Sequence, residues 1–317
     1  MTEAARERFP ELPLINAMPS PYKVYDCITF DGEDCLELRL RTQWERVDHF
    51  VIVEAEMTFA GATKALQFDP ERYAWASSKI RYIPLRAEEF AACQTAWDRE
   101  RLQRNALRCG YQDAAEHDVV VIADVDEIIR PEKIGPVKPG TVQVFELLML
   151  YFYCDYLMVS EPFWRKAVAV TGAYALAHEA EDIRNDTALR AVVKTIEIPD
   201  AGWHFSYLGG MDMIERKLER FSHQNLNKPR YKDREKNLAR IHAGKDIYRR
   251  AKRWGRVHMG DFGNEVVAQW FAQRPELFSP AAIRPVGNVD ALLAERRRSG
   301  RKPSAWEKLK LRVWNAW

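Results

Sequence analysis

A hydrophobic run that ends abruptly in acidic residues, Val119 to Ile128, limits the folds open to this chain. Its first five residues, Val-Val-Val-Ile-Ala, predict a strand buried on both faces, as in the parallel sheets of α/β proteins. Because side chains alternate along a strand, Asp124 and Asp126 are expected on one face, with Val125 turned into the core. Open α/β sheets bind their ligands at the carboxyl ends of such strands.

The paired acids predict a site for a divalent cation. Mg²⁺ and Mn²⁺ take oxygen ligands, commonly one or two carboxylates together with the phosphates of a substrate. The alternative for acids that follow a strand is a helix cap or a solvated loop. The continuous strand before these acids and Pro131 after them favour the metal site.

Size and composition indicate a globular protein of one large domain or two modest ones. The chain has 317 residues, of which 47% are hydrophobic and 30% charged. Its net charge of +2 gives no electrostatic reason to expect nucleic acid as a partner. The five cysteines are scattered without a Cys-x-x-Cys pair, which argues against zinc and a disulfide framework and suits a reducing cytosol. No apolar run has the length of a signal peptide or a membrane span, so a cytoplasmic location is expected.

Strand and helix signals alternate along the chain, which predicts an α/β fold. Residues 1–21 carry four prolines and predict an irregular arm. In the helix predicted at 95–109, Thr95 is the expected N-cap and Gly110 the expected C-cap. The predicted strands are 22–30, 48–54, 79–85 and 141–154, and the other predicted helices are 35–44 and 211 to about 223.

Two further segments carry residues suited to ligand binding. Arg104, on the helix that leads into the acidic strand, could reach a bound diphosphate, although a solvated helix face is the ordinary explanation for such arginines. Residues 201–210 form a polar and aromatic cluster around His204, with Gly209 and Gly210 as an anion-friendly turn before a helix. A lone histidine is more often a core residue, so a role for His204 requires that it face the acidic pair.

Several ordered motifs together resemble the family 17 glycosyltransferases, which include the animal enzyme that adds the bisecting N-acetylglucosamine to N-glycans. The resemblance covers about residues 22–250. Its motifs are Y-D-C at 25–27, F-D-G-E at 30–33, L-E-L-R-L at 36–40, V-D-H-F-V-I-V-E at 47–54, D-V-D-E-I at 124–128 and G-W-H-F-S at 202–206.

The resemblance implies a GT-A type, Rossmann-like fold with a mixed central sheet flanked by helices. It also implies a UDP-sugar donor, with UDP-N-acetylglucosamine as the expected one, a Mn²⁺ or Mg²⁺ ion at the Asp-x-Asp motif, and inversion at the anomeric carbon. The sequence shows no N-terminal membrane anchor like that of the animal enzyme, so the acceptor is expected only to be a glycan or a lipid-linked saccharide.

Roles for individual residues follow from the resemblance. Asp126 is the expected metal ligand, Asp124 would reach the metal or the ribose, and Glu127 would support them from behind. Inversion also needs a carboxylate that takes the proton of the acceptor hydroxyl. Asp212 is expected in that role because it opens the helix after the 202–206 motif, with Asp200 and Asp182 as alternatives.

The remaining predicted contacts concern the donor. His204 could be a third metal ligand or contact the diphosphate. Phe30, Asp31 and Glu54, at the ends of the first two predicted strands, could line the uridine pocket.

The C-terminal segment is basic and is expected as a tail, residues 286–317, after a glycosyltransferase domain at 22–285. Residues 295–312 hold eight Lys or Arg against two Glu. Trp306, Leu309, Val313 and Trp317 recur at near-helical spacing and predict a short amphipathic helix. That helix could pack on its own domain or lie on an anionic membrane, which would place the enzyme on the inner membrane face.

Two other functions are compatible with the acidic strand. Haloacid-dehalogenase-type phosphatases also use a strand followed by Asp-x-Asp, with the first aspartate as nucleophile, although their motif usually lies near the N-terminus. A non-catalytic protein that binds nucleotide sugars is the second alternative.

Overall fold

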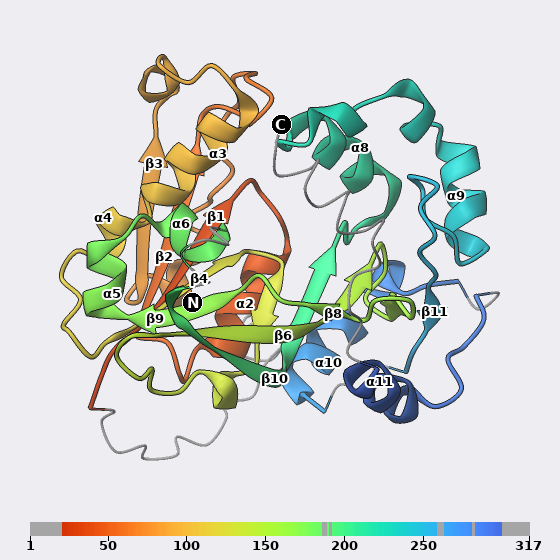
Figure 1. Cartoon of the computed structure of the whole chain (residues 1–317). Coiled ribbons are helices and arrows are strands. Elements are labelled where there is room, and N and C mark those ends of the chain that lie inside the picture. Colours follow the sequence, from red (N-terminus) through yellow and green to blue (C-terminus); the bar gives the residue numbers. More distant parts are fainter. Residues whose placement is uncertain (1–20, 186–188, 190–191, 259–262, 281–282, 300–317) are drawn as a thin grey trace.

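Four parallel strands form one half of the central sheet, in the order β3–β2–β1–β4 (Figure 1). The computed structural model describes residues 21–185, 189, 192–258, 263–280 and 283–299. A Rossmann sheet has the same order, 3-2-1-4, around its switch point, and its ligands lie where the strand order reverses, here between β1 and β4. The four strands are β1 (Val24–Phe30), β2 (His49–Ala55), β3 (Ile80–Leu85) and β4 (Val119–Asp124).

The other half of the sheet is mixed in direction. β6 (Thr141–Tyr151) pairs antiparallel with β9 (Val168–Thr171), which in turn pairs antiparallel with β4. β10 (Lys194–Ser206) runs parallel to β6 and also pairs antiparallel with β5 (Glu127–Ile129). The short strands β7 (Tyr156–Leu157), β8 (Phe163–Trp164) and β11 (Gly255–Arg256) complete the eleven strands of the described sheet.

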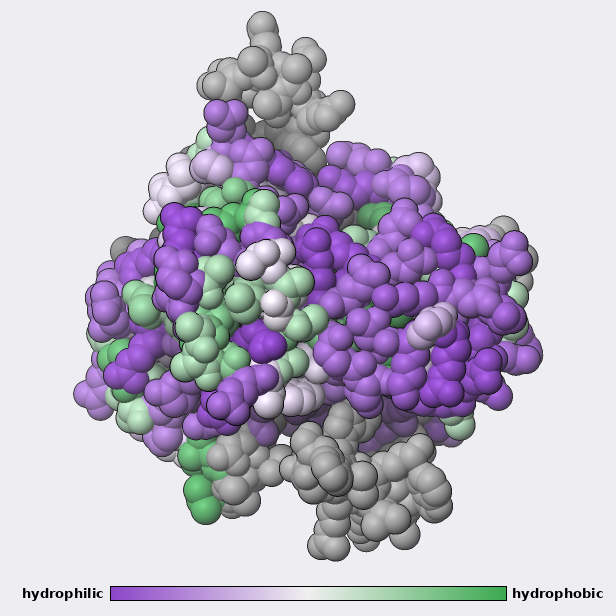
Figure 2. All heavy atoms as spheres, turned by 90° about the horizontal axis from the view of Figure 1, so that it is seen from above, coloured by the Kyte–Doolittle hydropathy of each residue, from purple (hydrophilic) through white to green (hydrophobic). Residues whose placement is uncertain are grey.

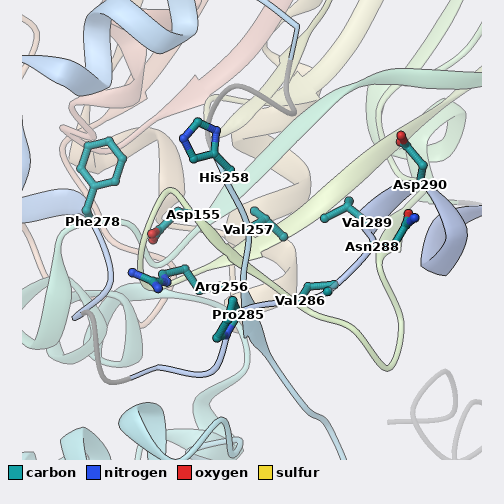
Figure 3. A pocket seen from close by; sticks show the side chains of 11 residues that line it. Asp155, Arg256, Val257, His258, Phe278, Pro285, Val286, Asn288, Val289 and Asp290 are labelled. Atoms are coloured by element: carbon teal, nitrogen blue, oxygen red, sulfur yellow. The ribbon is translucent and has the colours of Figure 1, made fainter.

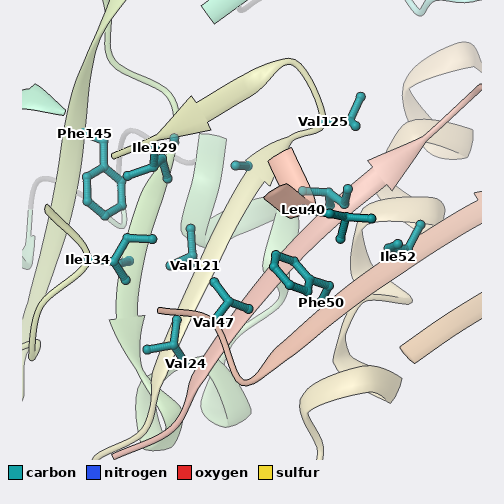
Figure 4. Packing of buried hydrophobic residues seen from close by; sticks show 14 of the residues in the cluster. Val24, Leu40, Val47, Phe50, Ile52, Val121, Val125, Ile129, Ile134 and Phe145 are labelled. Atoms are coloured by element: carbon teal, nitrogen blue, oxygen red, sulfur yellow. The ribbon is translucent and has the colours of Figure 1, made fainter. Parts of the chain in front are cut away.

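Helices cover both faces of the parallel half. α2 (Cys35–Gln43) packs on one face, where Leu36 and Leu40 join Val24, Phe50 and Val121 in a fully buried cluster (Figure 4). On the other face, Tyr111, Ala175 and Ile183 pack against the alternate residues of the same strands. These three residues belong to α4 (Arg108–Tyr111), α5 (Gly172–Ala177) and α6 (Ala180–Asn185), and α3 (Ala96–Asn105) lies nearby.

The C-terminal helices pack on the mixed half. Ile214 of α8 (Gly210–Arg220) and Ile241 of α9 (Arg234–His242) share a core with the end of β6. Phe271 of α10 (Glu265–Ala272) and Leu293 of α11 (Val289–Arg298) share another core with α2 and β10. The 3-10 turns are Ala74–Ala76, Ala87–Phe90, Pro131–Lys133, Gln224–Leu226, Pro229–Tyr231 and Pro275–Leu277.

The predicted fold class is confirmed: this is an α/β protein with a mixed central sheet flanked by helices. The helix predicted at 95–109 is shorter, because α3 ends at Asn105 and a separate turn of helix follows. Thr95 is the N-cap as predicted and accepts a hydrogen bond from the backbone N–H of Asp98. The C-cap prediction for Gly110 is wrong, because Gly110 lies inside α4, where a Cβ would lie 2.2 Å from the side chain of Val51.

Parts of the predicted arm and tail lie outside the described residues, namely residues 1–20 and 300–317 with Trp306, Leu309, Val313 and Trp317. The described start of the tail packs on the domain, because Leu293 is buried and Arg297 pairs with Glu146 at 2.8 Å. Within the described ranges, no helix is both long enough and apolar enough to cross a membrane.

Candidate active site

A cavity of about 460 Å³ opens at the carboxyl ends of β1 and β4, where the strand order reverses. Phe30 and Asp31 line it from the end of β1, and Asp126 lines it from the turn after β4. Arg216, Lys217 and other residues of α8 form the opposite wall. Seen from above, hydrophilic residues predominate on the side of the molecule where α8 and α9 lie (Figure 2).

Asp126 is the acid of the predicted pair that faces this cavity. β4 ends at Asp124, and Val125 and Asp126 form a turn before β5, so the expected alternation of the two acids on one strand is wrong. Asp126 lies 3.1 Å from Lys217 Nζ and 3.4 Å from His204 Nε2. Burial alone would raise the pKa of Asp126, but Lys217 and His204 outweigh this effect and hold the pKa below its ordinary value.

Asp124 is engaged by arginines outside the cavity lining. Its carboxylate accepts hydrogen bonds from Arg104 at 2.8 Å and from Arg184 at 2.6 Å. Burial would raise the pKa of Asp124, but Arg184 and Arg104 outweigh it and lower the pKa. Arg104 is 3% exposed and also contacts Glu100 and Glu181, so it is held in this ionic network.

Glu127 is fully buried behind the turn. It accepts hydrogen bonds from the Asp124 N–H, from Arg184 and from the indole of Trp164. These contacts fix the backbone that presents Asp126, which matches a supporting position for Glu127.

Arg39 of the L-E-L-R-L motif, for which the sequence predicted no role, braces the same turn from α2. Its guanidinium donates to both carboxylate oxygens of Asp26 at 2.5 Å and to the carbonyl oxygens of Asp124 and Glu127 at 3.0 and 2.6 Å. Both members of the ion pair are fully buried. Removing one partner of such a buried ion pair lowers the free energy of unfolding by several kcal/mol, because the remaining charge is left buried and uncompensated.

His204 faces Asp126, as a functional role for this histidine requires. It lies on β10 opposite Glu127 of β5, and its ring packs in a tilted arrangement 4.7 Å from that of Trp164, measured between ring centres. The residue is 5% exposed, and its Nδ1 atom is buried without a hydrogen-bond partner within the described structure. It does not itself line the cavity.

The ends of β1 and β2 play different parts. Asp31 lines the cavity and pairs with Lys64 at 3.1 Å and Arg220 at 3.2 Å. Glu54 is fully buried and accepts from Lys64 at 2.9 Å, from Tyr82, and from the backbone N–H groups of residues 67 and 68. Glu54 therefore holds the loop that carries Lys64, and it is not among the residues that line the cavity.

The three acids considered as the base lie at different places. Asp212 is at the cavity rim, where its side chain is 85% exposed and pairs with Arg234 at 2.6 Å. Asp200 lies 3.7 Å from Arg130, and Asp182 pairs with Arg101; neither acid lines the cavity.

Sequence reasoning missed Glu33 and the basic residues of α8 as parts of this site. Glu33 lines the cavity and accepts a hydrogen bond from the Asp31 N–H at 2.8 Å. Burial, together with the nearby Asp31 and Asp126, raises the pKa of Glu33 to about 7. Arg216, Lys217 and Arg220 could have been noted because they follow the Gly209-Gly210 turn at helical spacing.

The described residues do not fit a divalent ion held by both aspartates. Within these ranges, no three His, Cys, Asp or Glu side chains are grouped so as to hold a metal ion. Two guanidinium groups already engage Asp124, and an ammonium group engages Asp126.

A second cavity, of about 740 Å³, shares none of its lining residues with the first (Figure 3). It lies beside β11 and the start of α11, and its polar side chains are those of Asp155, Arg256, His258, Asn288 and Asp290. It contains none of the predicted site residues, and the ends of β1 and β4, where the strand order reverses, are not part of its lining.

No curated protein sequence matches the chain. Partial structural likenesses include a 4-diphosphocytidyl-2C-methyl-D-erythritol synthase, with 14% identity, a TM-score of 0.34, and coverage of 56% of this chain and 88% of that one. Another is the galactosyltransferase LgtC in complex with donor and acceptor sugar analogues, with 10% identity, a TM-score of 0.31, and coverage of 56% and 73%.

The family model described as glycosyltransferase family 17 matches residues 4–251. This range is most of the chain, and it contains the strand ends, the acidic turn and α8. The chain therefore belongs to glycosyltransferase family 17.

Proposed function

We propose that this glycosyltransferase moves N-acetylglucosamine from UDP-N-acetylglucosamine to a hydroxyl group of a glycan or a lipid-linked saccharide, with inversion. The observation that carries the proposal is the cavity at the switch point between β1 and β4, in a chain of this family. We assign this site to a GT-A type fold. Uridine would lie near Phe30 and Asp31 at the end of β1, and the diphosphate would lie between Asp126 and α8.

An inverting transfer needs a carboxylate on the acceptor side that takes the hydroxyl proton. Asp212, the residue predicted from the resemblance, stands at the rim, where an acceptor would enter. Glu33 is a second candidate, because a pKa of about 7 lets a carboxylate accept a proton near neutral pH. His204 supports Asp126 in this proposal.

The resemblance implies a Mn²⁺ or Mg²⁺ ion at the Asp-x-Asp motif, and the transfer proposed here does not depend on that ion. The cavity offers such an ion the carboxylate of Asp126, which has Lys217 as its present partner. Asp124, the other predicted ligand, is engaged by Arg104 and Arg184.

The phosphatase alternative is not favoured by the family match. It would make Asp124 the nucleophile, yet both oxygens of that carboxylate accept hydrogen bonds from arginines. A nucleophile of that class must be free to attack a phosphorus atom.

The proposal is tested by a calorimetric screen of UDP-sugars, with and without Mn²⁺, followed by a transfer assay on the preferred donor. We expect UDP-N-acetylglucosamine to bind and Asp126→Ala to abolish transfer. Asp113→Ala is the matched control, because Asp113 pairs with Arg81 on the surface and does not line the cavity. No heat with any UDP-sugar would refute the proposal, and binding without turnover would instead support the non-catalytic binder.

A further inference from the structure

α8 presents a group of cations to the cavity, Arg216, Lys217 and Arg220. Arg216 and Arg220 are four residues apart and so lie on one face of the helix. Arg216 donates to the carbonyl oxygen of Asp31, and Arg220 donates to its carboxylate at 3.2 Å. These contacts draw the wall formed by α8 against the carboxyl end of β1.

Lys217 stands beside Asp126, the acid of the predicted metal motif that faces the cavity. Its Nζ atom lies 3.1 Å from Asp126 Oδ2 and 4.9 Å from the centre of the Tyr207 ring. The side chain is 36% exposed, so it reaches the cavity from a partly buried position. An ammonium group has three N–H donors, and those not bound to Asp126 remain able to bind phosphate oxygens.

Two acids that line the cavity, Asp34 and Asp212, form ion pairs with arginines that do not line it. Asp34 pairs with Arg72, and Asp212 pairs with Arg234. Lys64 adds a fourth cation to the inner part of the cavity, where it pairs with Asp31. The inner wall thus carries several N–H donors on fixed cations, which is the chemistry that recognises a diphosphate.

We propose that Arg216, Lys217 and Arg220 bind the diphosphate of the nucleotide sugar, and that Lys217 is the cation beside Asp126 that stabilises the departing diphosphate. The donor then binds without a divalent ion. This inference rests on the proposed function. It also explains why the described residues bring an ammonium group, and no cluster of three potential metal ligands, to Asp126.

The transfer step needs no metal to account for its bonds, its electron pair and its proton. The bond between the anomeric carbon and the β-phosphate oxygen breaks, and its electron pair stays on the UDP. The acceptor oxygen forms the new bond to the anomeric carbon and gives its proton to a carboxylate of the site. The negative charge that develops on the diphosphate is met by the three cations of α8, in the way that positioned donors stabilise other developing oxyanions.

The test is calorimetry of UDP and uridine on the full chain, in EDTA and in Mn²⁺. We expect UDP to bind equally well in both buffers. Lys217→Ala should weaken UDP binding by about 10- to 100-fold, the usual effect of losing a hydrogen bond to a charged group, and should leave uridine binding unchanged. Lys217→Arg should retain most of the affinity for UDP.

Lys232→Ala is the matched control, because Lys232 pairs with Glu219 of α8 and does not line the cavity. If Lys217→Ala does not fold, as judged by circular dichroism, Arg220→Gln is measured in its place with the same expectation. UDP binding that needs Mn²⁺ and survives these substitutions would overturn this inference and leave the proposed function standing. No binding of UDP or any UDP-sugar in either buffer would overturn both.

Discussion

Glu33 is a carboxylate of the cavity whose pKa is raised. Burial, Asp31 and Asp126 raise its pKa from 4.5 to about 7, against the opposing effects of Lys217 and a backbone hydrogen bond. Between these two pH values the folded chain keeps a proton that the unfolded chain has lost. The contribution of Glu33 to the free energy of unfolding is therefore at its maximum below about pH 4.5 and declines as the pH rises toward 7.

Glu33→Gln should remove that pH dependence. Between pH 4.5 and 7.5, we expect the free energy of unfolding of the parent to fall by roughly 1–3 kcal/mol more than that of the variant. Urea denaturation at several pH values measures the difference. Asp34→Asn is the control, since it removes a neighbouring carboxylate whose side chain is 75% exposed. Parallel profiles for parent and Glu33→Gln would contradict the assignment.

The sequence indicated some residues of the site and not their partners. It singled out Asp126 and His204, which the structure places 3.4 Å apart. It placed Arg104 near a diphosphate, whereas Arg104 binds Asp124 together with Arg184 from α6. That pairing depends on how α3 and α6 pack against the sheet. Such packing cannot be predicted from a local sequence pattern.

At the scale of elements, strand β10 carries His204 to the site through an irregular path. Its pairing with β6 shifts register between Ile198 and Gly202, and from Gly202 onward it also pairs with β5. Gly202 has φ +139°, and a Cβ at this position would lie 2.1 Å from the carbonyl oxygen of Ile128. Only glycine allows the two strands to approach this closely.

Gly202→Ala should therefore separate β10 from β5 and displace His204. We expect a loss of about 1–3 kcal/mol in the free energy of unfolding, from backbone strain and overpacking, together with weaker UDP binding. Chemical denaturation and calorimetry measure the two effects. Gly135→Ala is the control, because a Cβ at Gly135 meets nothing within 4 Å. If Gly202→Ala and Gly135→Ala have the same free energy of unfolding and the same affinity for UDP, the close approach of β10 to β5 is unimportant.

The sequence predicted regular elements well and their ends poorly. The strands β2 and β4 were found because their apolar runs are continuous, and both are buried in the structure, whereas most residues of the outer strand β3 are only half-buried. The strand rule of alternating side chains failed after Asp124, because β4 ends there and a turn presents Asp126. Where a strand ends is decided by partners such as Arg39, which binds the carbonyl oxygens of this turn.

At the scale of the whole molecule, the site joins two parts of the chain that are far apart in sequence. One wall comes from the ends of β1 and β4, and the other comes from α8, which packs on the mixed half of the sheet. The alternation of elements predicted the α/β class. It could not predict the pairing of β10 with both β5 and β6, which brings α8 over the strand ends, because such pairing is set by long-range contacts.

A donor that bridges both walls should protect both from hydrogen exchange. We expect UDP to slow exchange at the amides of residues 30–35 and of α8, since its uridine would contact the first wall and its diphosphate the second. Uridine alone should protect only residues 30–35. At a hundred times its dissociation constant, UDP should also add about 2.7 kcal/mol to the free energy of unfolding.

Short labelling times separate these local effects from global stabilisation, because α5, which contributes nothing to the cavity lining, should then be unchanged. Protection at Arg256 and His258 of the second cavity instead would place the nucleotide there. Protection of α8 by uridine alone would reverse the expected orientation of the donor. Since the two walls meet through Arg216 and Arg220 on Asp31, a nucleotide that orders one wall should also hold the other in place.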